Sequence, residues 1–245
     1  MIEIRNLVHR YEGTTAVDDV SLTIPDGEFL VLTGANGSGK TTLVRHCNGL
    51  LEPTAGEVLV DGTPVEEDPV AARTAVGMTF QNPRDGFVAA TLGADVAFGP
   101  ENLGLERCEI DRRVEEALTA VGLAGREDER LSTLSGGEQQ RAAIAGALAM
   151  EPTHLILDEP FTGLDAPART SVLDRLNALR ADSTGIVVVT HDLRDLLEPA
   201  DRVIALANGD VAVDAPPARA VEQLSTVDVR PPGSRSNSDS RGSHT

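Results

Sequence analysis

Short hydrophobic runs, separated by polar turns and by longer helical patterns, divide this chain into alternating segments. Residues 29–32, 154–157 and 186–189 are short, almost wholly apolar runs, as in strands that are buried on both faces of a parallel sheet. Between the first two runs, residues 109–121 repeat apolar positions with helical spacing, and residues 142–150 are rich in alanine. This alternation predicts an α/β protein built on a parallel sheet.

The first apolar run leads into a phosphate-binding pattern. Residues 34–41 read Gly-Ala-Asn-Gly-Ser-Gly-Lys-Thr, which matches G-x-x-x-x-G-K-[ST] in full. The glycines let the backbone N–H groups face inward around an anion, and the start of the next helix adds partial positive charge. The expected nucleotide-binding residues here are Asn36, Gly37, Ser38, Gly39, Lys40, Thr41 and Thr42.

Two acids follow the run at 154–157. A carboxylate just beyond a buried parallel strand lies at the ligand-binding edge of an α/β sheet. Asp158 is suited to hold Mg²⁺ and Glu159 to activate a water, but neighbouring strand residues face opposite sides, so both serve one site only if the chain bends. Pro160 is consistent with that bend. His191, after the run at 186–189, leaves the same sheet edge and is either structural or part of the site.

A capped helix start lies near the middle of the chain. Ser135 is a good N-cap, Glu138 completes a capping-box spacing, and the N–H groups of Gly136 and Gly137 could hold an anion. From this segment in isolation, a simple cap remains the alternative interpretation.

These motifs together resemble the nucleotide-binding subunits of ABC transporters, in the family's order and over nearly the whole chain. The resemblance implies a P-loop NTPase core with a parallel sheet, an N-terminal antiparallel β subdomain (about residues 1–30, returning at 56–80) and an inserted helical subdomain at about residues 83–150. It places the ABC domain at residues 1–229. The remaining residues, 230–245, lack apolar periodicity and are expected to be a disordered tail.

The same resemblance assigns roles to individual residues. It implies an ATPase that uses ATP and Mg²⁺, with Glu159, His191 and Gln81 as catalytic residues and with Thr41, Gln81 and Asp158 around the metal. Tyr11 takes the place of the aromatic residue that stacks on adenine, and Asp165 belongs to the family's D-loop. It also implies a head-to-tail dimer with a second copy or a paralogue, in which Ser135 and Gly137 of one subunit close on the nucleotide held by Lys40 of the other.

Three stretches, 48–57, 80–83 and 95–105, resemble the ATPases of energy-coupling-factor importers, which take up cobalt, nickel or vitamins such as biotin. Two departures from that pattern are Glu138 in place of glutamine and the lack of a second glutamine within residues 84–87. Residues 81–100 are expected to dock integral membrane subunits at the cytoplasmic face of the membrane. The apolar residues expected to form this surface are Phe87, Val88, Leu92, Val96 and Phe98, the alternative being that they pack the helical core.

The composition of the chain limits which partners and which environment we expect for the protein. The formal net charge is -18, which disfavours a nucleic-acid partner, and no apolar run approaches the length of a membrane span. Cys47 and Cys108 lack paired or metal-like spacing and are expected to be reduced. Lys40 is the only lysine in the chain. Excess acid with so little lysine favours adaptation to concentrated salt, with an Arg-rich genome as the alternative explanation.

Two other functions remain open at this point. A cytosolic ABC ATPase without a transporter, such as that of iron–sulphur cluster assembly, has a similar length, but residues 81–100 argue against it. A nucleotide-binding module without catalysis would lack Glu159 or His191, and both are present.

Overall fold

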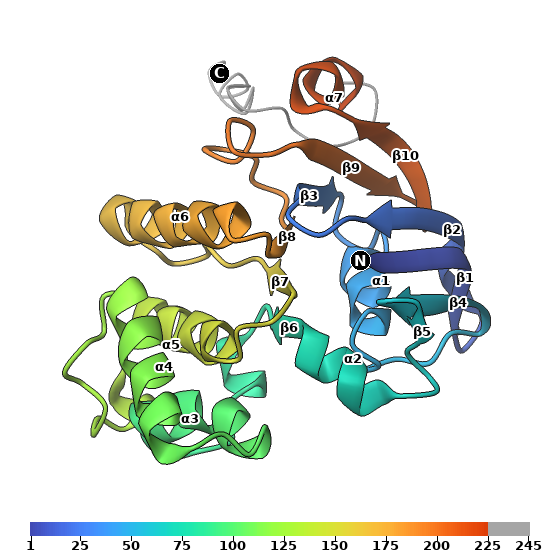
Figure 1. The fold of residues 1–245 in the computed structure, drawn as a ribbon. Helices are drawn as coiled ribbons and strands as arrows, with labels where there is room; N and C mark the ends of the chain where they lie inside the picture. The colour runs from blue at the N-terminus through green and yellow to red at the C-terminus, as the bar shows by residue number, and fades with distance from the viewer. Residues whose placement is uncertain (225–245) are drawn as a thin grey trace, which may run out of the picture.

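The computed structural model describes residues 1–224, which form two β-sheets flanked by helices (Figure 1). The strands are β1 (Ile2–Tyr11), β2 (Thr14–Ile24), β3 (Phe29–Gly34), β4 (Ala55–Val60), β5 (Thr63–Pro64), β6 (Val76–Thr79), β7 (His154–Asp158), β8 (Gly185–Val189), β9 (Arg202–Ala207) and β10 (Asp210–Ala215). The helices are α1 (Lys40–His46), α2 (Pro69–Ala75), α3 (Leu92–Asn102), α4 (Arg107–Ala120), α5 (Gly136–Ala149), α6 (Ala166–Ala181) and α7 (Pro217–Leu224), with 3-10 turns η1 (Pro83–Asp85) and η2 (Leu131–Thr133).

The central sheet has the order β10-β9-β3-β8-β7-β6, and all its strand pairs are parallel except β9 with β10. Its inner strands are buried on both faces, as the apolar runs predicted. In β7, Leu155 and Leu157 join the core under the helices, whereas Ile156 faces the core shared with α1 and the second sheet. This alternation explains why residues 155–157 of the strand are all apolar, and it confirms the α/β prediction.

The second sheet is antiparallel and has the order β2-β1-β4-β5. The residue ranges predicted for the antiparallel subdomain included too much of the chain, because β3 and β6 belong to the central sheet. The four residues 76–79 pair with β7 in parallel, and α2 carries the chain from one sheet to the other. Figure 1 shows α1 between the two sheets.

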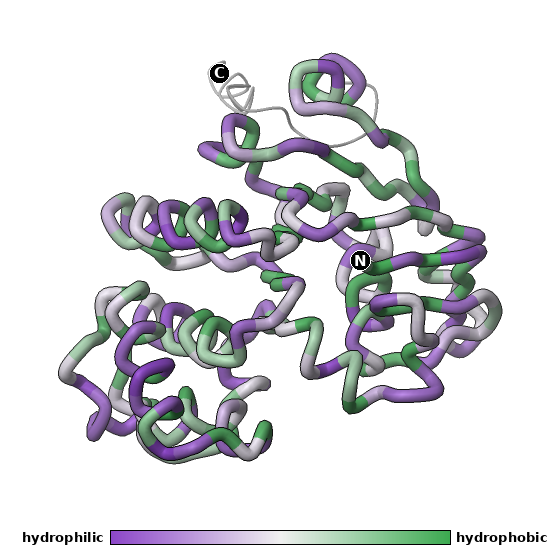
Figure 2. The backbone as a smooth tube through the Cα atoms, in the orientation of Figure 1, coloured by the Kyte–Doolittle hydropathy of each residue, from purple (hydrophilic) through white to green (hydrophobic). Residues whose placement is uncertain are grey.

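Helices α3, α4 and α5 pack together on the far side of the central sheet (Figure 1). Leu92 and Val96 of α3 are fully buried in this core, so the prediction that they belong to an exposed docking surface was wrong. The helical period places them on the face of α3 that packs against α4 and α5, while Phe98 remains 45% exposed. In the hydropathy view these helices alternate hydrophobic and hydrophilic stretches, as expected for helices buried on one side (Figure 2).

Within residues 1–224, no helix combines the length and hydrophobicity needed to cross a bilayer. Cys47 is buried and Cys108 exposed, and both are free thiols. The predicted tail at residues 230–245 lies outside the described residues.

Candidate nucleotide-binding site

The phosphate loop connects β3 to α1, as its motif predicted. Gly39 precedes the first turn of α1 with φ 102°, and a Cβ placed on it would lie 2.2 Å from the carbonyl oxygen of Ala16 in β2. Only glycine tolerates both this left-handed backbone and this close approach. The loop is therefore held against the antiparallel sheet.

Lys40 is 8% exposed, and its Nζ donates hydrogen bonds to the carbonyl oxygens of Gly34 and Ala35, both at 2.9 Å. Burial lowers the pKa of this ammonium, while the charges of Glu159 and Asp158 oppose the shift. The lysine charge is thus held inside the loop by carbonyl groups, which a phosphate oxygen could replace as partners.

Thr41 and Asp158 face each other at the loop. The Thr41 Oγ1 donates to Oδ2 of Asp158 at 2.9 Å, and Asp158 is buried at the end of β7. Burial raises the pKa of this carboxyl, and the negative charge of Glu159 adds to the effect, whereas the Thr41 hydrogen bond opposes it. A hydroxyl and a carboxylate oxygen are the hard donors that Mg²⁺ prefers, and a cation beside them would offset the cost of burying the charge. The pair therefore fits the predicted metal.

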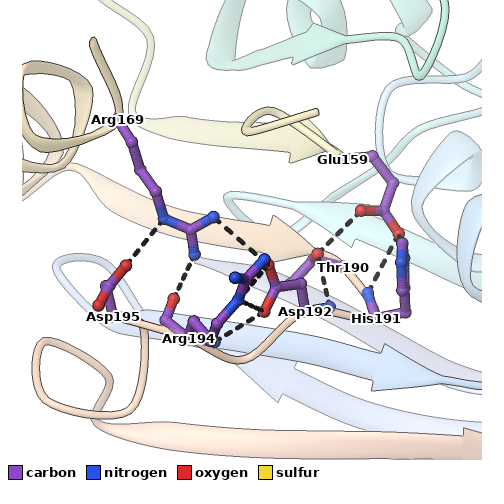
Figure 3. A network of polar contacts seen from close by, with 7 residues as sticks. All are labelled: Glu159, Arg169, Thr190, His191, Asp192, Arg194 and Asp195. Atoms are coloured by element: carbon purple, nitrogen blue, oxygen red, sulfur yellow. Dashed lines mark hydrogen bonds and ion pairs between the residues drawn. The ribbon is translucent and has the colours of Figure 1, made fainter. Parts of the chain in front are cut away.

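The chain bends at Glu159, which has φ 50°. This left-handed backbone, uncommon for a residue with a side chain, lets Asp158 and Glu159 serve one cleft, as the sequence required. The Glu159 carboxylate accepts from Thr190 Oγ1 at 2.8 Å and from the His191 backbone N–H at 3.1 Å, and His191 Nδ1 lies 2.7 Å from its Oε1 (Figure 3). Glu159 and His191 thus belong to one hydrogen-bonded group.

A second set of contacts lies beside this group and joins it through Asp192 (Figure 3). Asp192 accepts from Arg194 and lies 3.5 Å from Arg169 Nη1 of α6, and its backbone N–H donates to Thr190 Oγ1. The Arg194 guanidinium holds the pKa of Asp192 at about 2. The Arg169 guanidinium also stacks over the Phe161 ring, 4.6 Å from its centre. Sequence reasoning missed Thr190 and Arg169, because neither belongs to a motif considered in the sequence analysis.

A cleft of about 400 Å³ opens above the phosphate loop. Tyr11 and Gln81 both line it, Tyr11 at 45% exposure. The lining residues are Tyr11, Ala16, Asn36, Gly37, Gly39, Lys40, Thr41, Thr42, Gln81, Asp158 and Glu159. Ser38 is absent from the lining, since its side chain is buried beneath the loop with no hydrogen-bond partner on its hydroxyl.

Ser135, Gly137 and Asp165 lie outside this cleft. Ser135 caps α5 in a full capping box with Glu138, whose pKa of about 2 reflects the hydrogen bonds from Ser135 and Arg126. A Cβ on Gly137 would lie 2.9 Å from the Gly163 carbonyl oxygen, so the start of α5 touches the loop that leads to Asp165. These three predicted residues therefore form a second group, separate from Lys40 within one chain.

Comparison with known families decides the identity of this arrangement. The model of the ABC transporter family matches residues 17–162, which include the phosphate loop, the capped start of α5 and the two acids at the end of β7. The chain belongs to the ABC transporter family. This ABC ATPase is an ATP-binding subunit that hydrolyses ATP.

Curated relatives cover most of its length. A protein of Halobacterium salinarum, a halophile, whose name assigns it the ATP-binding role of an ABC transporter, is 68% identical over 95% of this chain and 100% of its own. The energy-coupling factor transporter ATP-binding protein EcfA of Methanocaldococcus jannaschii is 40% identical, covering 93% of this chain and 83% of its own. The cobalt import ATP-binding protein CbiO of Syntrophus aciditrophicus is 45% identical, covering 89% and 79%.

Solved structures share the fold. CbiO1 of Clostridium perfringens, part of the CbiONQ transporter complex, superposes with a TM-score of 0.79 at 32% identity and covers 92% of each chain. The dimeric bacterial ABC transporter cassette MJ0796 gives a TM-score of 0.81 at 30% identity, covering 88% of this chain and 98% of that one. The ABC ATPase fold expected from the sequence is thus confirmed.

Proposed function

We propose that this ABC ATPase powers a membrane importer for a metal ion such as cobalt or nickel, or for a vitamin such as biotin. The relatives named for energy coupling and cobalt import support this class of cargo. The relatives described above are named for transport, which gives the cytosolic alternative no support.

One observation carries the importer proposal. Six large hydrophobic side chains are exposed over residues 1–224, and three of them, Leu50, Val88 and Phe98, line one groove of about 230 Å³. Exposed apolar residues gathered in one hollow are typical of a surface that binds a helix. This groove lies within and beside the segment 81–100 and is the proposed docking site for a membrane subunit at the cytoplasmic face of the membrane.

The segment that lines the groove also reaches the nucleotide cleft. Gln81 lines the cleft, and Phe80, Pro83 and Val88 line the groove. The Arg84 Nε donates to the Oε1 of buried Gln139 in α5 at 3.0 Å, which attaches the segment to the helix that Ser135 caps. A change at the nucleotide therefore has a short physical route to the docking surface.

Within the cleft, Tyr11 is proposed to stack on adenine, and the loop from Asn36 to Thr42 to bind the phosphates. Thr41, Gln81 and Asp158 would hold Mg²⁺, which when bound neutralises charge on the phosphates. Glu159 is the proposed base, because its carboxylate is held at the edge of the cleft by Thr190 and His191. His191 commits Nδ1 to Glu159, which leaves Nε2 for the γ-phosphate.

The second group completes the site from another subunit. Ser135, Gly137 and Asp165 lie outside the cleft of their own chain, and the structurally similar cassette MJ0796 is a dimer. A head-to-tail dimer, with a second copy or a paralogue, would bring the capped start of α5 over the nucleotide held by Lys40, where its N–H groups can bind an anion.

Uptake measurements test whether this ATPase powers import of the proposed cargo. Cells whose own copy carries Glu159→Gln should lose ATP-dependent uptake of labelled Co²⁺ or Ni²⁺, or of labelled biotin, and wild-type protein should restore it. Cells with the silent surface change Val70→Thr serve as the matched control, because Val70 is 70% exposed on α2, outside both the cleft and the groove. Unchanged uptake of all three cargoes in the Glu159→Gln cells would contradict the proposal.

A further inference from the structure

Two buried histidines connect Tyr11 to the helix that begins at Lys40: His9 lies beside Tyr11 on β1, and His46 belongs to the helix. His9 and Tyr11 are two residues apart on β1 and therefore share a face, and their ring centres lie 4.5 Å apart in an edge-on arrangement. On its other side His9 meets His46, with ring centres 4.8 Å apart. His46 is the last residue of α1, so the three rings connect the edge of the cleft to the phosphate-loop helix.

Hydrogen bonds determine which ring nitrogens of His46 and His9 donate and which accept. The His46 Nδ1 lies 2.7 Å from the Thr42 carbonyl oxygen, which only accepts, so Nδ1 carries the proton. The His46 Nε2 is then an acceptor, and His9 Nδ1 donates to it at 3.1 Å while also lying 3.2 Å from the carbonyl oxygen of Glu52. When His46 is neutral, both of its ring nitrogens and the Nδ1 of His9 therefore have compatible partners, and burial lowers the pKa of His46.

Tyr11 itself has little else to hold it. His9 and His46 are 8% and 1% exposed, whereas Tyr11 is 45% exposed. Over the described residues, its hydroxyl has one hydrogen-bond contact, a long 3.5 Å approach to Thr42 Oγ1. A purely hydrophobic neighbour could pack against the ring but could not hydrogen-bond to α1. The histidine pair does both.

We propose that His9 and His46 are positioning residues that hold the Tyr11 ring at a set place relative to the phosphate loop, so that purine base and phosphates are bound in register. Neither histidine lines the cleft, so each acts through Tyr11. The inference rests on the proposed stacking of adenine on Tyr11. It adds a specificity function to two residues that carry none of the phosphate chemistry.

Comparing ATP with inorganic tripolyphosphate tests this, because tripolyphosphate lacks the base. We expect Tyr11→Ala to raise the Kd for ATP about tenfold, the size of a lost base–aromatic stack, with tripolyphosphate binding unchanged. His9→Ala and His46→Ala in the full chain should raise the Kd for ATP about three- to tenfold and leave that for tripolyphosphate within about twofold. Equal losses for both ligands would mean that the histidines only support α1, and would overturn the proposal.

A double variant separates this inference from the stacking itself. If His9 acts through Tyr11, then His9→Ala combined with Tyr11→Ala binds ATP no more weakly than Tyr11→Ala alone. Additive losses would overturn the positioning function. An unchanged Kd for ATP in Tyr11→Ala would instead overturn the proposed stacking, and so distinguishes the two failures.

The composition provides a readout that needs no nucleotide. The chain has one tyrosine and no tryptophan, so its tyrosine fluorescence reports Tyr11 alone. We expect acrylamide to quench this emission more strongly in His46→Ala than in wild type. The control His154→Ala, which removes a buried imidazole at the start of β7, should leave quenching unchanged.

His9→Phe covers the case in which the alanine variants do not fold. It retains a ring against Tyr11 but cannot hydrogen-bond to His46, so its Kd for ATP should rise about threefold with tripolyphosphate binding intact. Wild-type affinity for ATP in His9→Phe, or unchanged quenching in a folded His46→Ala, would overturn the proposal.

Discussion

The Nδ1 atom of His191 lies 2.7 Å from Oε1 of Glu159, although 32 residues separate them in the chain. Strands β7 and β8 pair in parallel with Asp158 opposite Val189, so the residues just beyond both strands meet at one edge of the sheet. Glu159 and Thr190 then face each other, and His191 follows. The register of two strands thus assembles the proposed catalytic pair.

The first prediction concerns the base. Glu159→Gln should retain ATP binding but lose at least about 100-fold in ATP turnover, because an amide cannot accept the proton of the attacking water. Single-turnover hydrolysis and nucleotide binding measure the two effects. A turnover close to wild type in the assembled complex would show that another group is the base.

Replacing Thr190 should lower ATP turnover less than replacing Glu159. Thr190→Val keeps the side-chain volume but removes the hydrogen bond to the Glu159 carboxylate and the acceptor of the Asp192 N–H, so turnover should fall about tenfold with ATP affinity retained. Thr184→Val, outside both the cleft and the network of Figure 3, is the matched control. Equal turnover in wild type and Thr190→Val would remove Thr190 from the site.

Lys40 should resist replacement by the other common cation. The ammonium fits between the Gly34 and Ala35 carbonyl oxygens at 2.9 Å from each, and a planar, larger guanidinium does not fit that space. Lys40→Arg should therefore lose ATP binding nearly as fully as Lys40→Ala, in a folded protein. Isothermal titration with ATP checks both variants, and retained affinity in Lys40→Arg would show that charge alone suffices.

Salt should control stability. With a net charge of -18, repulsion among the acids opposes folding unless salt screens it. The melting temperature should rise from dilute buffer to molar KCl. Equal melting temperatures in the two buffers would favour an Arg-rich genome as the cause of the composition, despite the similarity to a protein from a halophile.

Acid should destabilise the fold through its buried histidines. Burial lowers the pKa values of His46 and His154 from the ordinary 6.5, so the unfolded chain takes up protons before the folded one does. The free energy of unfolding is therefore unaffected by these histidines above pH 6.5, where both are neutral in either state, and it falls as the pH drops below 6.5. Urea unfolding in constant molar KCl at pH 7.5 and pH 5.5 measures the loss. His154→Gln should reduce it, and an equal loss in this variant would exclude His154 as a source.

The docking groove gives the last prediction. Val88→Asp or Phe98→Asp should abolish co-purification with the membrane subunits while leaving ATP binding intact, because each replaces an exposed apolar side chain of the groove with a charge. Phe87 is less suitable, since it also packs against the helical core. Val70→Asp, at a more exposed position outside the groove (70% exposed, against 58% for Val88 and 45% for Phe98), should co-purify normally. Retained co-purification of both groove variants would place the coupling surface elsewhere.

The sequence by itself determined the parts whose cause is local. The glycines and Lys40 define a phosphate loop, Ser135 and Glu138 define a capped helix, and the apolar run before Asp158 defines a buried strand. Each depends on backbone preference or on a spacing of a few residues, which the chain carries wherever it is placed. The structure agrees with all three.

Only the tertiary structure decided which distant residues meet. Strand order and register brought Thr190 to Glu159, and the packing of α1 against β1 brought His46 to His9. The packing of α3 against α4 and α5 buried Leu92 but left Phe98 exposed, although both are apolar residues of one helix. Periodicity shows that a helix has an apolar face, but the neighbouring elements determine how much of that face is covered, and that information is not local.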